Sequence, residues 1–190
     1  MPVIEIHVME GYGDDARSRL CTALTDAVLT VVPATPEAIT VLVNEVVPSG
    51  YMRGGKARPP APARHEPAAL VKAFLGAMES RDLEAARSFL ADGFTMQFPA
   101  SPPMHTLDEL IAWAAPRYRA IRKTYVGFDT AVASGRVVVY ARGTLSGEWL
   151  DGSLFDGIRF IDRFELEGDK LIGQEVWNDL AETLRQGMTQ

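Results

Sequence analysis

An aspartate stands in an otherwise apolar row near the end of the chain. In GIRFIDRFEL (residues 157–166) nearly every second residue is apolar, and Asp162 falls in one row with Ile158, Phe160, Phe164 and Leu166. An ionised carboxylate among apolar side chains is costly, so it should be paired or have a raised pKa. Either state suits acid-base chemistry on a carbonyl substrate, and we therefore predict a catalytic role for Asp162.

Two structural roles remain open for Asp162. It could form a salt bridge with Arg142 or another strand arginine, or it could lie at a strand bulge and face solvent. Aromatic residues elsewhere in the second half of the chain could line a pocket for a flat apolar ligand, although ordinary core packing would also explain them. The candidates for substrate binding in this pocket are Phe98, Trp113, Tyr118, Tyr140 and Trp177.

The composition narrows the class of protein. The 190 residues are 47% apolar and 23% charged, which is typical of a soluble globular chain. Apolar runs stay below the ~18 residues that span a bilayer, so we expect a cytoplasmic protein without a membrane partner. A net charge of -6 without a dense Lys and Arg cluster argues against nucleic acid. The histidines are widely spaced and Cys21 fits a buried structural thiol, so no metal or cofactor is expected.

A proline-rich segment divides the chain. The stretch KARPPAPARHEP (residues 56–67) contains four prolines and almost no large apolar side chain. Such a composition favours an extended spacer. We predict a first unit in residues 1–56, a linker in residues 57–67 and a second unit in residues 68–190.

The first unit has the pattern of a strand, a helix and a second strand. Residues 2–9 and 38–47 are rich in β-branched residues, and residues 14–32 carry apolar residues at helical spacing. The helix carries the chain back across the sheet, so the strands should be parallel. One helix covers only one face, and a unit of about 55 residues with an uncovered apolar face is not stable alone. We therefore expect a homo-oligomer that forms through this βαβ unit.

The second unit begins with helices and ends with strands. Helical spacing marks residues 70–78 and 83–90, and the capping box TLDE opens a third helix that should extend to Tyr118, with a kink at Pro116. From Tyr125 the apolar pattern changes to a period of two over four segments separated by turns. This order predicts an α+β fold, with three helices packed on one face of a curved antiparallel sheet.

The first unit resembles the 4-oxalocrotonate tautomerase family across residues 2–56. The resemblance rests on PVIEIHVMEG, on LTDAV at the helix end, on the strand AITVLVNEV and on the closing YMRGG. It implies a catalytic N-terminal proline: once Met1 is removed, Pro2 is a secondary amine that can take a proton from the carbon beside a carbonyl. A free α-amino group titrates near ~8, and an apolar pocket disfavours its cationic form, so such a base is available at neutral pH.

The substrate-binding positions depart from the pattern of that family. The family has an arginine just after the EG pair and another in the second strand, where this chain has Tyr12 and Thr40; the aromatic residue before the closing glycines is present as Tyr51. Without guanidinium groups the bidentate clamps for a carboxylate are missing. The loss of the two arginines, at Tyr12 and Thr40, therefore implies an uncharged substrate or a unit that no longer catalyses.

The second unit resembles the SnoaL-like group of the nuclear transport factor 2 superfamily, a cone-shaped α+β barrel. The resemblance rests on the order of helices and strands, on ADGFTMQF and on the closing GIRFIDRFELEGDKLIGQEVWND. Such cones host cyclases, isomerases and proteins without catalysis. Asp162 resembles in position the acid that hydrogen-bonds the oxyanion in ketosteroid isomerase. The base and the tyrosine of that enzyme correspond to Phe98 and Phe74, so the same mechanism is not expected.

Two functions follow from these patterns. The first is an isomerase of the keto-enol tautomerase type, or a polyketide-cyclase-like enzyme, that acts on an enolisable carbonyl compound with Pro2 as general base. The alternative is a silent tautomerase-like oligomerisation module that carries a catalytic or merely ligand-binding cone. In both, the expected partner is a small molecule.

Overall fold

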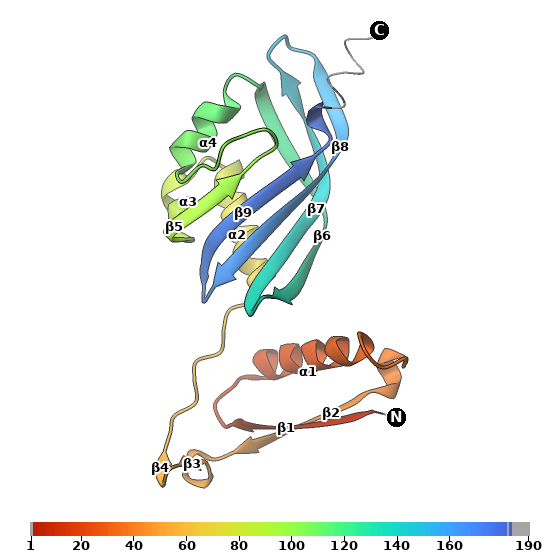
Figure 1. Cartoon of the computed structure of the whole chain (residues 1–190), viewed down its shortest axis with the longest axis vertical. Coiled ribbons are helices and arrows are strands. Elements are labelled where there is room, and N and C mark those ends of the chain that lie inside the picture. The colour runs from red at the N-terminus through yellow and green to blue at the C-terminus, as the bar shows by residue number, and fades with distance from the viewer. Residues whose placement is uncertain (1, 182, 184–190) are drawn as a thin grey trace. The chain divides into compact units, whose positions relative to one another are not determined.

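The computed structural model describes residues 2–181 and 183, and the chain divides into two compact units, Met1–Arg64 and His65–Gln190 (Figure 1). The boundary falls within the proline-rich segment, where residues 58–66 contain no helix or strand. None of the helices in the described part of the chain is long and apolar enough to cross a membrane.

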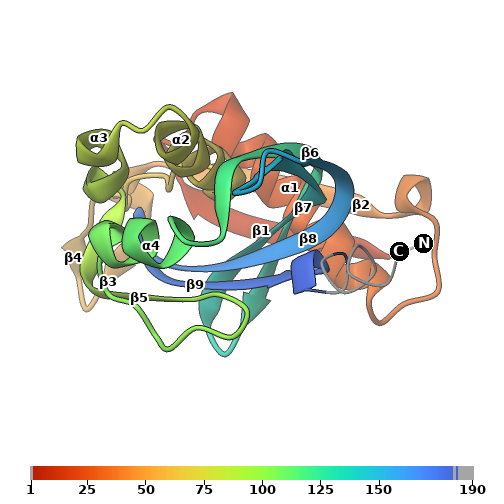
Figure 2. The same cartoon turned by 90° about the horizontal axis from the view of Figure 1, so that it is seen from above.

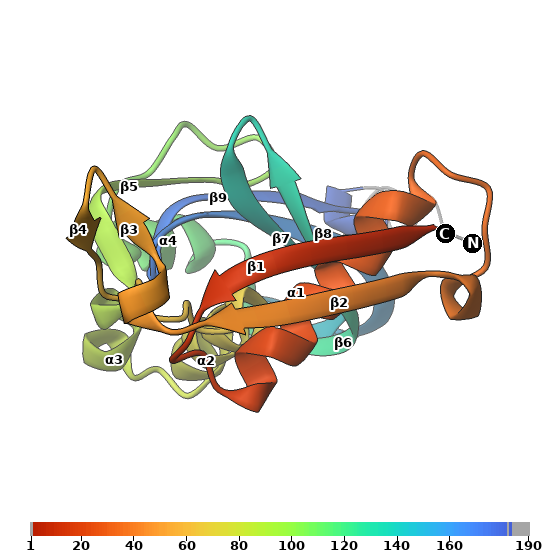
Figure 3. The same ribbon diagram turned by 90° about the horizontal axis from the view of Figure 1, so that it is seen from below.

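The first unit is a βαβ unit. Strand β1 (Val3–Met9) pairs in parallel with β2 (Thr40–Val46), and α1 (Asp14–Leu29) lies along one face of the pair (Figure 3). The helix ends three residues earlier than expected, because a β-branched run and Pro33 follow it. The remaining elements are short: η1 (Pro36–Ala38), η2 (Pro48–Gly50), β3 (Met52–Arg53) and β4 (Lys56–Ala57).

We had expected the face of this sheet opposite α1 to be continuously apolar, but it is not. Val3 and Leu42 lie on it and are 57% and 47% exposed, but Glu5 and Asn44 lie on the same face and share a hydrogen bond of 2.8 Å. The reason is the alternation along β1, which places every second residue on the uncovered face. No described residue of this unit is fully buried, so the unit has no core of its own.

The three predicted helices of the second unit are present as α2 (Pro67–Glu79), α3 (Leu83–Ser88) and α4 (Leu107–Ala114). The predicted capping box at the start of α4 is present. The predicted kink at Pro116 is wrong, because α4 ends at Ala114 and Tyr118 already begins a strand. The Ala115 N-H group still donates to the Ile111 carbonyl oxygen, but Pro116 has no N-H group with which to continue the helix.

The helices lie on one side of a curved five-stranded sheet with the order β5-β9-β8-β7-β6 (Figure 2). Strands β6 to β9 are antiparallel neighbours, whereas β5 pairs with β9 in parallel, so the sheet is mixed. Strand β5 had not been expected. The strands are β5 (Leu90–Gln97), β6 (Tyr118–Ala133), β7 (Arg136–Trp149), β8 (Leu154–Glu167) and β9 (Lys170–Asn178).

Two apolar clusters fill the second unit. The larger lies between the helices and the sheet and includes Phe74 and Phe164, whose rings meet edge to face at 5.9 Å. The smaller lies towards the other end of the sheet and includes Leu145 and Phe160. Asp162 belongs to neither cluster but lies between Phe160 and Phe164 in the same strand, so the core positions its carboxyl group between two packed aromatic rings.

Candidate active site

Asp162 lies on the inner face of the sheet, and its side chain is 0% exposed. The alternation of buried and exposed residues along β8 places it there, as the sequence predicted. Its carboxylate oxygen Oδ2 accepts a hydrogen bond from Lys123 Nζ and forms an ion pair with it. The expected partner Arg142 instead pairs with Asp129 at 2.9 Å. The counter-ion of Asp162 is thus a lysine from β6, two strands away in the sheet.

The environment of Asp162 perturbs its titration. Burial raises the pKa of its carboxyl group, while the charge and hydrogen bond of Lys123, together with Gln174, act in the opposite direction. Its second oxygen, Oδ1, has no hydrogen-bond partner among the described residues. A buried carboxylate with a raised pKa and a free oxygen is suited to accept and return a proton.

A cavity of about 160 Å³ lies against Asp162, between α2, α4 and the inner face of the sheet. Its wall is mainly apolar and aromatic, and Lys123, Gln174 and Asn178 add polar groups to it. Three of the predicted substrate-binding residues line this cavity together with Asp162, namely Phe98, Trp113 and Tyr118. Phe74, at the position that corresponds to a catalytic tyrosine in ketosteroid isomerase, also lines it.

Helix α4 holds Trp113 at the cavity wall. Its ring lies 5.2 Å from the ring of Phe98, and the guanidinium carbon of Arg117 lies 3.9 Å from its centroid. Arg117 also donates a hydrogen bond to the Trp113 carbonyl oxygen. The indole Nε1 is buried and has no partner among the described residues. The ring is therefore fixed from two sides while its N-H group stays free.

Two tyrosines line the cavity on the β6 side. Burial raises the pKa of Tyr118, with a smaller opposing effect of Arg81 and Arg117. Burial also raises the pKa of Tyr125, and the charges of Asp162 and Glu79 raise it further. Both phenols are therefore neutral at physiological pH and can donate a hydrogen bond.

The sequence reasoning missed Lys123 and Tyr125. Both fall in one alternating row with Ile121 along β6, and this period of two was a signal for an inward-facing strand. The row was overlooked because the third helix was expected to extend to Tyr118, and the strands were expected to begin only at Tyr125.

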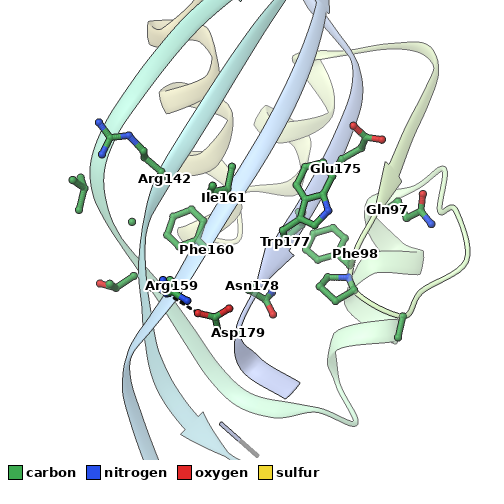
Figure 4. Close-up of a pocket in the computed structure, with 16 residues that line it drawn as sticks. Gln97, Phe98, Arg142, Arg159, Phe160, Ile161, Glu175, Trp177, Asn178 and Asp179 are labelled. Carbon is green, nitrogen blue, oxygen red and sulfur yellow. Dashed lines mark hydrogen bonds and ion pairs between the residues drawn. The ribbon is translucent and has the colours of Figure 1, made fainter. Parts of the chain in front are cut away.

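The structure does not bring Tyr140 or Trp177 to the cavity. Both point to the outer face of the sheet, since their neighbours Ala141 and Val176 are the residues that face inwards beside Asp162. Trp177 is 53% exposed and lies in a shallow groove of that face, near the Arg159 and Asp179 ion pair (Figure 4).

The candidate residues of the first unit lie at two ends of its sheet. Pro2 precedes β1, and its carbonyl oxygen accepts a 3.0 Å hydrogen bond from the Thr40 N-H group. Tyr12 follows the end of β1 and Tyr51 follows the end of β2, and a seven-residue strand spans about 20 Å. Because the strands are parallel, both tyrosines lie at the far end from Pro2 within one chain. Met1, whose removal would free the Pro2 nitrogen, lies outside the described residues.

The described residues contain no group of three or more His, Cys, Asp or Glu side chains that could hold a metal ion.

Family models match both units. The model of the SnoaL-like domain matches residues 71–173, more than half of the chain, and the model of the tautomerase enzyme family matches residues 2–57. The chain therefore belongs to the SnoaL-like family, and its N-terminal unit is tautomerase-like. The comparison with curated proteins found no match.

Solved structures similar to this chain share the fold of its second unit. An NTF2-like protein of unknown function from Burkholderia pseudomallei is 21% identical, with 62% of this chain and 94% of that chain covered and a TM-score of 0.52. An NTF2-like protein from Burkholderia thailandensis is 15% identical, covering 64% and 96%, with a TM-score of 0.53. TerC, co-crystallised with polyporic acid, is 16% identical, covering 62% and 95%, with a TM-score of 0.52. At these identities the similarity establishes the fold and nothing more.

Proposed function

We propose that the second unit is an acid-base catalyst of the isomerase type, which interconverts the keto and enol forms of a small carbonyl compound in the cavity beside Asp162. One observation carries this proposal. The buried carboxylate of Asp162 is paired with Lys123 through one oxygen, while its other oxygen, at the cavity wall, has no partner among the residues that the structure describes. Buried, perturbed acids beside a cavity are typical of catalytic sites.

The ion pair can move one proton without any cofactor. Asp162 Oδ1 accepts the proton of the enol hydroxyl group while the Lys123 ammonium group donates a proton to the enol carbon. The carbonyl bond forms as the carbon-carbon double bond of the enol breaks. Lys123 contacts the other oxygen, Oδ2, so a turn of the carboxyl group brings the proton from Oδ1 to the Lys123 amine, which restores both groups. The same steps in reverse convert the keto form into the enol.

The test follows hydrogen exchange at carbon. Wild type, Asp162→Asn and Lys123→Met are incubated in D₂O with a panel of small uncharged ketones and diketones, and deuterium beside the carbonyl is measured by proton NMR. We expect wild type to accelerate exchange and both variants to lose at least tenfold, since general acid-base catalysis typically contributes about 10²- to 10⁴-fold. Asp129→Asn, at an exposed strand carboxylate, is the matched control and should keep full activity. Equal exchange by wild type and Asp162→Asn would contradict the proposal.

A second activity, in the first unit, is favoured by the match of residues 2–57 to the tautomerase enzyme family. In this proposal Pro2 is the general base for an enolisable compound. Tyr12 and Tyr51 would have to come from a neighbouring copy, because they lie at the opposite end of the sheet from Pro2. Assembly of the chain into a homo-oligomer is part of this proposal.

The variant Pro2→Ala separates the two activities in the same exchange experiment. If Pro2→Ala loses exchange and Asp162→Asn does not, the first unit catalyses. The opposite result makes the first unit a silent assembly module. If neither variant changes exchange, the cone is a ligand-binding domain for the compounds tested.

A further inference from the structure

Two buried polar atoms lack a hydrogen-bond partner in the described part of the chain, and both belong to residues of the cavity wall. One is Trp113 Nε1, which can only donate, and the other is Asp162 Oδ1. Most buried polar atoms in proteins are paired, because an unpaired one loses its hydrogen bonds to water without replacement. The residues of the cavity wall thus include one free donor and one free acceptor that a ligand could satisfy.

The position of Trp113 makes its N-H group a fixed feature of the site. Arg117 lies over the indole ring, Phe98 packs against it at a tilt of 48°, and the capping box of α4 fixes the helix that carries it. A phenylalanine would supply an aromatic ring at this position without the need to satisfy an N-H group. We therefore regard the indole N-H as a recognition group rather than a part of the apolar packing.

The size of the cavity limits the ligand to about one ring. Its volume is about 160 Å³. An engineered cavity of about 150 Å³ in another protein binds benzene. The aromatic residues around the cavity, Phe74, Phe160 and Tyr125 among them, provide flat apolar contact for such a ring.

The charges around the cavity favour an uncharged ligand. The charge of Lys123 is already balanced by Asp162. Glu79 is about half exposed and faces Arg122 at 3.9 Å, and Arg81 is exposed. A charged group buried without a counter-ion is unfavourable, so an ionised ligand has no place inside.

We infer that the cavity takes an uncharged single-ring compound whose carbonyl oxygen accepts a hydrogen bond from Trp113 Nε1 and whose hydroxyl group donates one to Asp162 Oδ1. Trp113 is then a specificity-determining residue that selects the carbonyl end of the ligand. The inference rests on the proposed function, since a cyclic enol with a conjugated carbonyl presents these two groups. A phenol that carries an acetyl group on its ring presents the same two groups. Its ring hydroxyl group does not ketonise, so it tests binding through these groups apart from the proposed reaction.

Calorimetric titration of the full chain with p-hydroxyacetophenone and its analogues tests this inference. We expect p-hydroxyacetophenone to bind more tightly than p-methylacetophenone, which lacks the donor, and p-ethylphenol, which lacks the acceptor. The naphthalene counterpart, with two rings, and the anion p-hydroxybenzoate should bind more weakly still. Tighter binding of the two-ring compound or of the anion would overturn the ligand class, and so would the absence of binding by p-hydroxyacetophenone.

The variant Trp113→Phe tests the role of the indole N-H, since it keeps an aromatic ring and removes the donor. We expect about a tenfold loss of affinity for p-hydroxyacetophenone and no loss for p-ethylphenol, which has no carbonyl to accept the bond. Trp149→Phe is the matched control, because Trp149 packs on Phe155 and is not among the residues of the cavity wall. An equal loss for both ligands would show that Trp113 acts by packing alone.

The binding test of the ligand class and the exchange test of the proposed reaction can fail independently of each other. If the ligand series behaves as expected but Asp162→Asn does not reduce deuterium exchange, the ligand class stands and the proposed reaction is wrong. If Asp162→Asn abolishes exchange but the two-ring compound binds best, the reaction stands and the ligand class is wrong.

Discussion

The Asp162 and Lys123 pair is a costly arrangement for a protein core. Taking both charges out of water costs free energy, and a buried pair repays it only when the hydrogen bonds are complete. Here one carboxylate oxygen has none among the described residues. A pair of apolar residues would stabilise the domain at least as well, so the pair is better explained by chemistry than by stability.

The pKa of Asp162 predicts a pH dependence of stability. Because burial raises that pKa, the folded state binds more protons than the unfolded state between the ordinary value of ~3.9 and the raised value. The contribution of Asp162 to the free energy of unfolding should therefore fall as pH rises through this window. Urea unfolding of wild type and Asp162→Asn at several pH values measures it, as the difference between the two proteins.

The groups around this carboxyl group are Lys123 and Tyr125 from β6 and Gln174 from β9, and they stay the same in both proteins. Asp129→Asn serves as the control for an exposed carboxylate. A difference between wild type and Asp162→Asn that does not change with pH would contradict the prediction.

The sequence predicted the position of Asp162 but not its partner. The period of two along β8 is a local property, so it can be read from consecutive residues. The contact with Lys123 depends on the register of β6, β7 and β8, and β6 has a register shift between Tyr125 and Gly127. Such irregularities are set by the packing of the whole sheet, so spacing along the chain could not identify the pair.

At the level of elements, α4 matters because it carries Trp113. Thr106 Oγ1 accepts a 3.1 Å hydrogen bond from the Glu109 N-H group, and Glu109 accepts bonds from His105 and Thr106, which lower its pKa. A helix of eight residues is marginal without such caps. The cap therefore supports the position of the indole.

We expect Thr106→Ala to lower the free energy of unfolding by about 1 kcal/mol, the usual effect of losing a helix N-cap. Thr106→Ser keeps the hydroxyl group and should lose much less. Urea denaturation followed by circular dichroism measures both. Equal losses for the two variants would show that the methyl group, and not the cap, is responsible.

Two glycines in β7 allow it to lie close to β6. A Cβ atom at Gly143 would lie 1.9 Å from the Thr124 carbonyl oxygen, and one at Gly147 would lie 2.1 Å from that of Ala120. These positions lie in the strand pair that borders the cavity. Close approach of backbone is a common reason for glycine within a strand.

Gly143→Ala should therefore destabilise the second unit by about 1–3 kcal/mol or more, the range found for overpacked sites. Gly76→Ala is the matched control: it lies on the exposed face of α2, nothing lies within 4 Å of the added atom, and alanine should stabilise the helix by about 0.5–1 kcal/mol. Thermal unfolding of both variants gives the comparison. Similar melting temperatures would contradict the close-approach argument.

Strand β5 is an element that the sequence did not predict. Its sequence LADGFTMQ contains an Asp-Gly pair, which usually indicates a turn, and it follows α3 almost directly. The strand tolerates this pair because its pairing with β9 shifts register between Leu90 and Thr95. Tertiary pairing thus overrode a local turn signal.

At the level of the whole molecule, no described residue of the first unit is fully buried, and this is the basis for proposing that a second copy covers its sheet. Leu42 lies on the open face, 47% exposed. We expect wild type to be an oligomer and Leu42→Glu to dissociate it, because a carboxylate would be buried in the interface. Light scattering coupled to gel filtration measures the mass.

Ser18→Glu, on the exposed side of α1, is the control for added charge and should keep the mass of wild type. A monomeric wild type, or an unchanged mass for Leu42→Glu, would contradict assembly through this face.

If the first unit assembles with other copies as proposed, its folding also depends on protein concentration. A unit that gains its cover from neighbours is stabilised by mass action, whereas the second unit carries its own core and does not depend on dilution. Dilution would therefore unfold the tautomerase-like half and leave the cone intact. Any activity that belongs to the first unit would then fall faster than protein concentration, while cone activity would fall in proportion to it.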